Sequence, residues 1–124
     1  MPDWVPVDVQ IYGPKEELEK LEAYFAPAEG TYDGYTLFSQ ILPTPPDVED
    51  PIQWRIDNWG SIKDFFFEID YASDQEMSLR GKATWQPHIA GFQAVANMFP
   101  KLEIIMSIWT REEWILTAEE GDTK

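Results

Sequence analysis

The sequence has no cysteine, and this absence excludes several classes of protein. Without thiols there is no disulfide framework, no thiol nucleophile and no thiolate metal site. The one histidine, His88, is too few for a zinc site, which normally has several histidine or cysteine ligands. No run of eighteen apolar residues occurs, so we expect no membrane-spanning helix. The first residues also lack the pattern of a signal peptide, and the absence of cysteine fits a reducing compartment, so we expect a protein of the cytoplasm.

Basic residues are scarce as well. The chain has 9 lysines and arginines against 23 aspartates and glutamates, which gives a formal net charge of −14. Phosphate backbones are bound through lysine and arginine. We therefore expect no direct binding of nucleic acid or of an anionic membrane surface, and we expect cations or basic protein surfaces as partners. The alternative is that the charge only keeps a small domain soluble.

What the chain does contain is enough apolar surface for a core. Hydrophobic residues make up 44% and aromatic residues 15% of its 124 residues, which is typical of a folded protein. This length predicts a single domain over residues 1–124.

Periodicity predicts a strand, a helix and then a hairpin. Residues 5–11 alternate apolar and polar side chains, the pattern of a strand with one buried face. A helix follows from Pro14, which suits the first helical position, until Pro27 ends it. The segments 64–72 and 76–85 alternate again and predict two paired strands. Their inward residues are expected to be Phe65, Phe67, Ile69, Tyr71, Met77, Leu79, Ala83 and Trp85, with Glu68 and Asp70 facing outward opposite Arg80 and Lys82.

The second half of the pattern completes a fold prediction. A helix over residues 87–99 is followed by a strand over 102–109, an edge strand over 114–119 and an acidic tail at about 118–124. Residues 28–63 are irregular, with a short strand in "YTLFSQIL" and an extended connection in "PTPPDVEDP". The order predicts an α+β protein with a ferredoxin-like, split βαβ plan. In this plan two helices lie on one face of an antiparallel sheet, and residues 28–63 are an insertion in the first crossing.

The most aromatic stretch, residues 52–70, contains Asn58, Trp59 and Gly60 in a row. Asparagine and glycine both tolerate a left-handed backbone, so this motif predicts a turn. Two interpretations remain open. The aromatic side chains form either a structural plug over the open end of the sheet or an exposed patch, ringed by carboxylates, that binds another protein.

No pattern indicates catalysis. His88 would need a nucleophile and an orienting acid to act as a general base, and no motif supplies them, so we interpret it as a partly exposed residue at a helix end. Asp47, Glu49 and Asp50 lack the glycine-spaced loop of an EF-hand and are interpreted as a solvated acidic loop. We therefore expect no enzyme, no cofactor and no metal. A hydrolase built on a pair of carboxylates remains a third hypothesis, and it requires acids of perturbed protonation in a cleft.

Several segments together resemble a known family. They are "MPDW", "GPKEELEKL", "ILPTPPD", "IDNWGSIKD" and "TWQPHIAGFQAVANMFPKLEI", and in this order they are similar to the YubB-type ferredoxin-like proteins of plasmids and bacteriophages. The chain departs from the family pattern at Asp3, at Val5, where members have cysteine, and at Asp64, where they have an aromatic residue. The resemblance implies a ferredoxin-like fold and a mobile-element setting, and it supplies no catalytic residues.

Charge and resemblance together predict a phage or plasmid accessory protein in the cytoplasm of a bacterial host. We expect it to inhibit a host defence system, in the manner of an anti-CRISPR or anti-restriction protein. Its acidic face would bind the basic nucleic-acid-binding surface of a nuclease or nucleic-acid-guided complex. The alternative is a non-enzymatic interaction module anchored by exposed tryptophans, among them Trp109 and Trp114. The candidate partner-binding residues are Glu16, Glu17, Glu19, Glu22, Glu68, Asp70, Glu112, Glu113, Trp54 and Trp59.

Overall fold

The computed structural model describes residues 4–27, 34–84, 87–108 and 113–118, and within them the protein has an α+β fold. Its strands are β1 (Trp4–Tyr12), β2 (Ala26–Pro27), β3 (Tyr35–Thr36), β4 (Phe66–Ala72), β5 (Glu76–Thr84), β6 (Glu103–Ile108) and β7 (Glu113–Leu116). Its helices are α1 (Lys15–Glu22), α2 (Phe38–Ile41), α3 (Pro51–Asn58) and α4 (Ile89–Met98).

The seven described strands form one antiparallel sheet in the order β2-β3-β4-β5-β1-β6-β7. Strand β1 lies between β5 and β6, so that Val9 faces Leu79 on one side and Met106 on the other. The α+β class and the antiparallel sheet predicted from the sequence are therefore confirmed.

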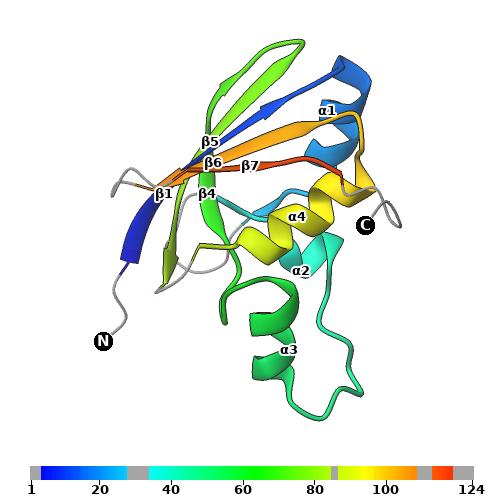
Figure 1. The fold of residues 1–124 in the computed structure, drawn as a ribbon, viewed down its shortest axis with the longest axis vertical. Coiled ribbons are helices and arrows are strands. Elements are labelled where there is room, and N and C mark those ends of the chain that lie inside the picture. Colours follow the sequence, from blue (N-terminus) through cyan, green and yellow to red (C-terminus); the bar gives the residue numbers. More distant parts are fainter. Residues whose placement is uncertain (1–3, 28–33, 85–86, 109–112, 119–124) are drawn as a thin grey trace.

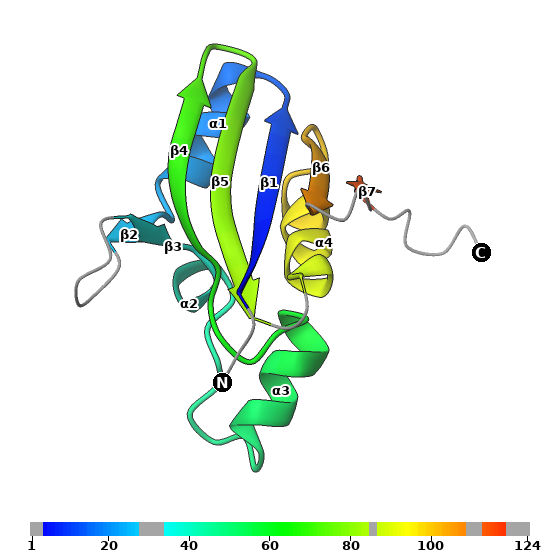
Figure 2. The same ribbon diagram turned by 90° about the vertical axis from the view of Figure 1, so that its left-hand side faces the viewer.

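Helices α1, α2 and α4 cover one face of this sheet (Figures 1 and 2). The alternation of β1 sets this face, because Val7, Val9 and Ile11 are at most 1% exposed while Asp8 and Gln10 between them are exposed. The core therefore lies between the sheet and these helices, and the outward residues of β1, β4 and β5 form an open sheet face on the opposite side.

The predicted helices are present and bury the predicted sides. Helix α1 buries Leu18 and Leu21, and α4 buries Phe92, Val95 and Ala96. Their bounds differ from the prediction, since α1 begins at Lys15, after Pro14, and α4 begins at Ile89, two residues after Pro87. The first helix is also shorter than predicted: it ends at Glu22, and Ala26 and Pro27 form strand β2.

The β4–β5 hairpin is present as well, with one correction to its pattern. The register shifts between Ile69 and Tyr71, so that Tyr71 faces Ser78 and Ala72 faces Met77. An extra residue in one strand reverses the alternation beyond it. The prediction that Tyr71 points inward is therefore wrong, and its side chain is 54% exposed.

The predicted insertion, residues 28–63, contains more regular structure than expected. Only residues 35 and 36 of the segment "YTLFSQIL" form a strand, and the short helix α2 follows from Phe38. Helix α3 begins directly after the proline-rich connection. Asp50 caps α3 by accepting a hydrogen bond from the backbone N–H of Gln53, and Pro51 occupies its first turn.

Candidate functional site

The aromatic motif forms a buried corner at the C-terminal end of α3. Trp59 is 4% exposed, and its ring nitrogen donates a 2.8 Å hydrogen bond to the carbonyl of Leu42. Gly60 ends the helix with φ 87°, and its N–H bonds the carbonyl of Ile56, the left-handed helix end that glycine favours. Trp59 therefore belongs to the core and offers almost no surface to a partner, as the plug interpretation expected. Trp54 is half-buried and packs at the edge of the same cluster.

His88 is also part of this core, which corrects the expectation of a partly exposed side chain. It is 1% exposed, because its ring stacks on Phe38 and meets the edge of Phe65. Its Nε2 lies 2.6 Å from the carbonyl oxygen of Lys63, while its Nδ1 has no hydrogen-bond partner. Burial lowers the pKa of His88, and the bond to Lys63 and the nearby Asp64 carboxylate oppose this effect. The ring is therefore neutral near pH 7, with its proton on Nε2.

The glutamates of α1 lie on the exposed side of that helix, away from the sheet. Glu16, Glu19 and Glu22 are exposed, and within the described residues no basic side chain forms an ion pair with them. Glu17 is different, because Lys20 bonds its carboxylate at 3.3 Å. This ion pair joins residues three positions apart on the helix.

The other predicted acids lie elsewhere. Glu68 and Asp70 belong to the open sheet face, where Arg80 lies 3.5 Å from Asp8 and 3.8 Å from Asp70. Glu113 is exposed on β7 at the sheet edge, whereas Glu112, Trp109 and residues 119–124 fall outside the described residues. The candidate acids of α1 and of β4 therefore occupy opposite sides of the sheet.

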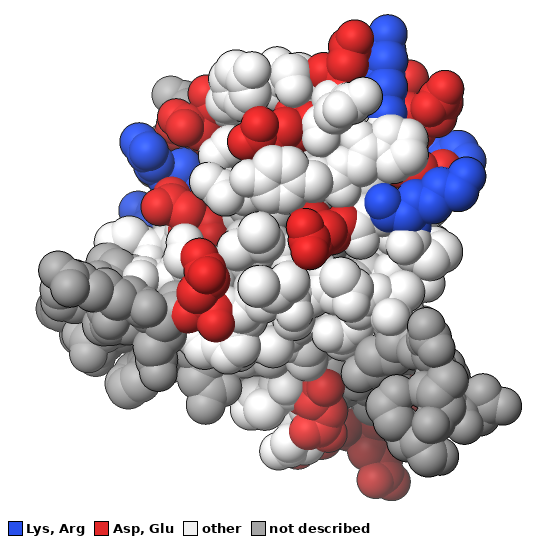
Figure 3. Space-filling model, turned by 45° about the horizontal axis from the view of Figure 1, so that its top comes forward, with Lys and Arg blue, Asp and Glu red and all other residues white. Residues whose placement is uncertain are grey.

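Charge on the visible surface is dispersed. Figure 3 shows acidic side chains spread across one face of the molecule, with uncharged atoms between them and lysine or arginine side chains toward its upper edges. The structure therefore brings some predicted acids together on α1 but does not gather the whole set into one patch.

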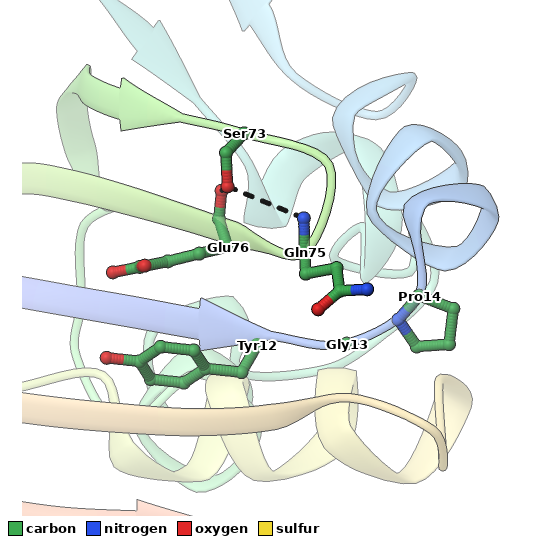
Figure 4. Close-up of a pocket in the computed structure, with 6 residues that line it drawn as sticks. All are labelled: Tyr12, Gly13, Pro14, Ser73, Gln75 and Glu76. Carbon is green, nitrogen blue, oxygen red and sulfur yellow. Dashed lines mark hydrogen bonds between the residues drawn. The ribbon is translucent and has the colours of Figure 1, made fainter.

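An open hollow lies where β1 meets α1 beside the β4–β5 turn. It has a volume of about 640 Å³ and is lined by Tyr12, Gly13, Pro14, Ser73, Gln75 and Glu76. The Tyr12 ring and the Glu76 carboxylate extend from neighbouring strands in the same direction (Figure 4). The residues that line this hollow include one carboxylate, that of Glu76, and one phenol, that of Tyr12, but no imidazole.

A second hollow, of about 370 Å³, is bordered by Ser39 and Asp64. The Asp64 carboxylate accepts hydrogen bonds from the backbone N–H groups of Phe38 and Ser39, each at 2.8 Å, and from the Ser39 hydroxyl. Asp64 thus satisfies the free N–H groups at the start of α2. The Ser39 hydroxyl donates to the Asp64 carboxylate, which backbone N–H groups also engage, and the His88 imidazole bonds a backbone carbonyl, so the serine is not paired with the imidazole.

The described parts of the chain provide no candidate group of metal ligands and no helix that could span a membrane. They contain no group of three or more histidine or acidic residues placed to hold a metal ion. The longest described helix, α4, has 10 residues, well short of the length that a membrane span needs.

Comparisons with protein-family models, with curated proteins and with solved structures found no match.

Proposed function

We propose that this protein is a non-enzymatic binding protein whose partner presents a basic surface, and that this partner is a host nuclease or nucleic-acid-guided complex. The observation that carries the proposal is the unpaired acidic side of α1. Three exposed glutamates, Glu16, Glu19 and Glu22, follow one another at intervals of three residues without a basic partner among the described residues.

The spacing of these glutamates supports competition with a nucleic acid. A rise of about 1.5 Å per residue separates successive glutamates by about 4.5 Å along the helix axis, against about 3.4 Å per phosphate on one DNA strand. The stripe on α1 thus has a charge spacing close to that of one strand over about three phosphates. Acids elsewhere on the surface strengthen the overall field, which speeds association with a basic partner.

The inhibitory role and the mobile-element setting rest on the resemblance to YubB-type proteins. We also propose that β4, β5, β1 and β6, with α1 and α4, form a ferredoxin-like core to which β2, β3 and β7 are added. This proposal is supported by the antiparallel order of those four strands and by the position of both helices on one face.

The test is capture of partners from a bacterial lysate at two salt concentrations, with and without added DNA. At about 0.05 M salt we expect nucleic-acid-binding proteins to be retained, and at about 0.5 M salt we expect their loss, because exposed charges are screened. Added DNA should displace them if both compete for one basic surface. If the retained proteins stay bound at both salt concentrations and in the presence of DNA, the proposal is contradicted.

Matched variants locate the effect on α1. Replacing Glu16, Glu19 and Glu22 by glutamine removes three charges from exposed positions and should weaken retention. Replacing Lys15 and Lys20 by glutamine removes positive charge from the same helix and should strengthen it. Equal retention of both variants would contradict a role for α1.

A further inference from the structure

Helix α3 stands apart from the rest of the fold. It lies beyond the end of the sheet, below α2 and α4 in the view of Figure 1, and none of its eight residues is buried. An isolated helix of this length is only marginally stable in water. Its caps at Asp50 and Gly60 and the burial of Trp59 therefore hold in place a helix that adds no fully buried residue to the core.

The outer side of α3 carries an uncovered apolar pair. Ile52 is 53% exposed and Ile56 is 36% exposed, and their (i, i+4) spacing places them side by side. The half-buried residues Trp54, Arg55 and Asn58 fall on the other side of the helix. The two isoleucines are therefore presented outward on a fixed helix.

Exposed acidic residues precede and follow this apolar pair in the chain. Asp57 is exposed next to Ile56, and Asp47 and Glu49 are exposed in the segment that leads into the helix. The one basic residue of α3, Arg55, forms no ion pair with the described acids. Arg55 donates a hydrogen bond from Nε to the Thr44 hydroxyl at 3.1 Å, and its guanidinium lies 5.4 Å from the centre of the Trp59 ring.

We infer that the outer side of α3 is a docking site for a basic amphipathic segment of the partner protein. Apolar side chains of that segment would pack on Ile52 and Ile56, while its lysines or arginines would lie near Asp57 and Glu49. A second copy of this chain would bring the same carboxylates together and is disfavoured by repulsion, as is an anionic membrane. The inference rests on the proposed function and names the surface on which part of the basic partner binds.

The test uses a synthetic peptide of about 14 residues that has leucines at helical spacing and lysines elsewhere, titrated into isotope-labelled protein. We expect chemical-shift changes concentrated in residues 47–58. A matched peptide with glutamate in place of lysine should not bind. The variant I52Q/I56Q keeps residues that favour a helix but removes the apolar anchor, so it should bind the lysine peptide about tenfold or more weakly than the wild type does.

Two further variants separate the contributions. I115T removes an exposed isoleucine from β7, an edge strand of the sheet, and should leave peptide affinity unchanged. D57N retains an oxygen that can accept the bond from Gln53 Nε2 and should weaken binding in a salt-dependent way. Because the substituted positions are exposed, each variant should keep the fold, and its spectrum without peptide can be compared with that of the wild type to check this.

The outcomes distinguish this inference from the proposed function. Chemical-shift changes on α1 in place of α3 would overturn the docking site on α3, while the proposed binding of a basic partner would still stand. Equal binding of the glutamate peptide, or unchanged affinity of I52Q/I56Q, would also overturn the docking site. Absence of any binding of the lysine peptide, together with failure of the salt-dependent capture, would overturn both.

Discussion

His88 makes the stability of this protein sensitive to acid in a way that one substitution can isolate. The ring is 1% exposed, Nε2 donates to the carbonyl of Lys63, and Nδ1 has no partner. Protonation would place a charge and an unsatisfied N–H beside Phe38 and Phe65. Burial therefore lowers the pKa of His88 in the folded protein below its ordinary value of 6.5, against the smaller opposing effects of Lys63 and Asp64.

The direction of the pH effect follows from the difference in the pKa of His88 between the folded and the unfolded protein. Well above pH 6.5 the ring is neutral in both the folded and the unfolded protein, so its contribution to the free energy of unfolding is constant and fully present. Below that pH the unfolded chain takes up the proton first. The free energy of unfolding then falls by up to about 1.4 kcal/mol per pH unit, until the folded ring is protonated too.

The perturbation is His88→Phe, which keeps an aromatic ring but removes the titratable group. Near pH 8 the variant should be less stable by about 1–3 kcal/mol, because the Lys63 carbonyl loses its donor. Between pH 6.5 and about pH 5.5 this difference should shrink by up to about 1.4 kcal/mol, since only the wild type loses stability through His88. Urea unfolding at each pH, followed by tryptophan fluorescence, measures the difference.

The control is Ile104→Val, which removes one buried methyl group at a cost of about 0.5–1.5 kcal/mol and contains no titratable group. The difference in free energy of unfolding between Ile104→Val and the wild type should not change with pH. Titration of the carboxylates elsewhere changes the stability of both proteins by the same amount. If the difference in free energy of unfolding between His88→Phe and the wild type is also independent of pH, the reasoning is refuted.

Three further predictions concern single contacts. Asp64→Ala removes the cap of α2 and should lower the free energy of unfolding by about 2–3 kcal/mol in urea, whereas Asp47→Ala, at an exposed loop position, should change it by less than about 0.5 kcal/mol. Gly60→Ala should cost about 1–2 kcal/mol by the same measurement, because an alanine at φ 87° is strained and its Cβ would lie 3.2 Å from the backbone of Ala90; an unchanged midpoint would contradict this account. Arg80→Ala should change thermal stability by less than about 1 kcal/mol, since its two ion pairs are solvent-exposed, and a larger loss would show that they are stronger than exposed pairs normally are.

The elements that the sequence predicted are those whose evidence is local. The apolar spacing of α1 and α4 and the alternation of β1 reveal which side is buried, because each pattern lies within one element. Helix α3 also has local signals that the proline-rich context obscured. Asp50 followed by Pro51 is a typical helix start, and Gly60 a typical helix end.

The residues that sequence reasoning placed wrongly depend on distant contacts. His88 is buried because the Lys63 carbonyl, 25 positions earlier, and the Phe38 ring meet it in the fold. The role of Asp64 depends on a distant contact in the same way, because its carboxylate caps α2, whose start lies 26 positions earlier in the chain. The shift of register before Tyr71 has no signature in the residue pattern, since the reversal becomes visible only when the partner strand is placed.

The aromatic stretch thus has a structural role that makes the proposed docking site possible. Because Trp59 is buried, it is not itself a binding anchor, but its burial fixes the C-terminal end of α3 against the core. The exposed isoleucines of α3 are then presented on a helix whose position is set before any partner arrives, and preorganisation of this kind reduces the entropy lost on binding. Substituting Trp59 would therefore weaken binding through loss of the helix position, whereas substituting Ile52 and Ile56 would weaken it through loss of contact. Only the first change should also lower the stability of the free protein.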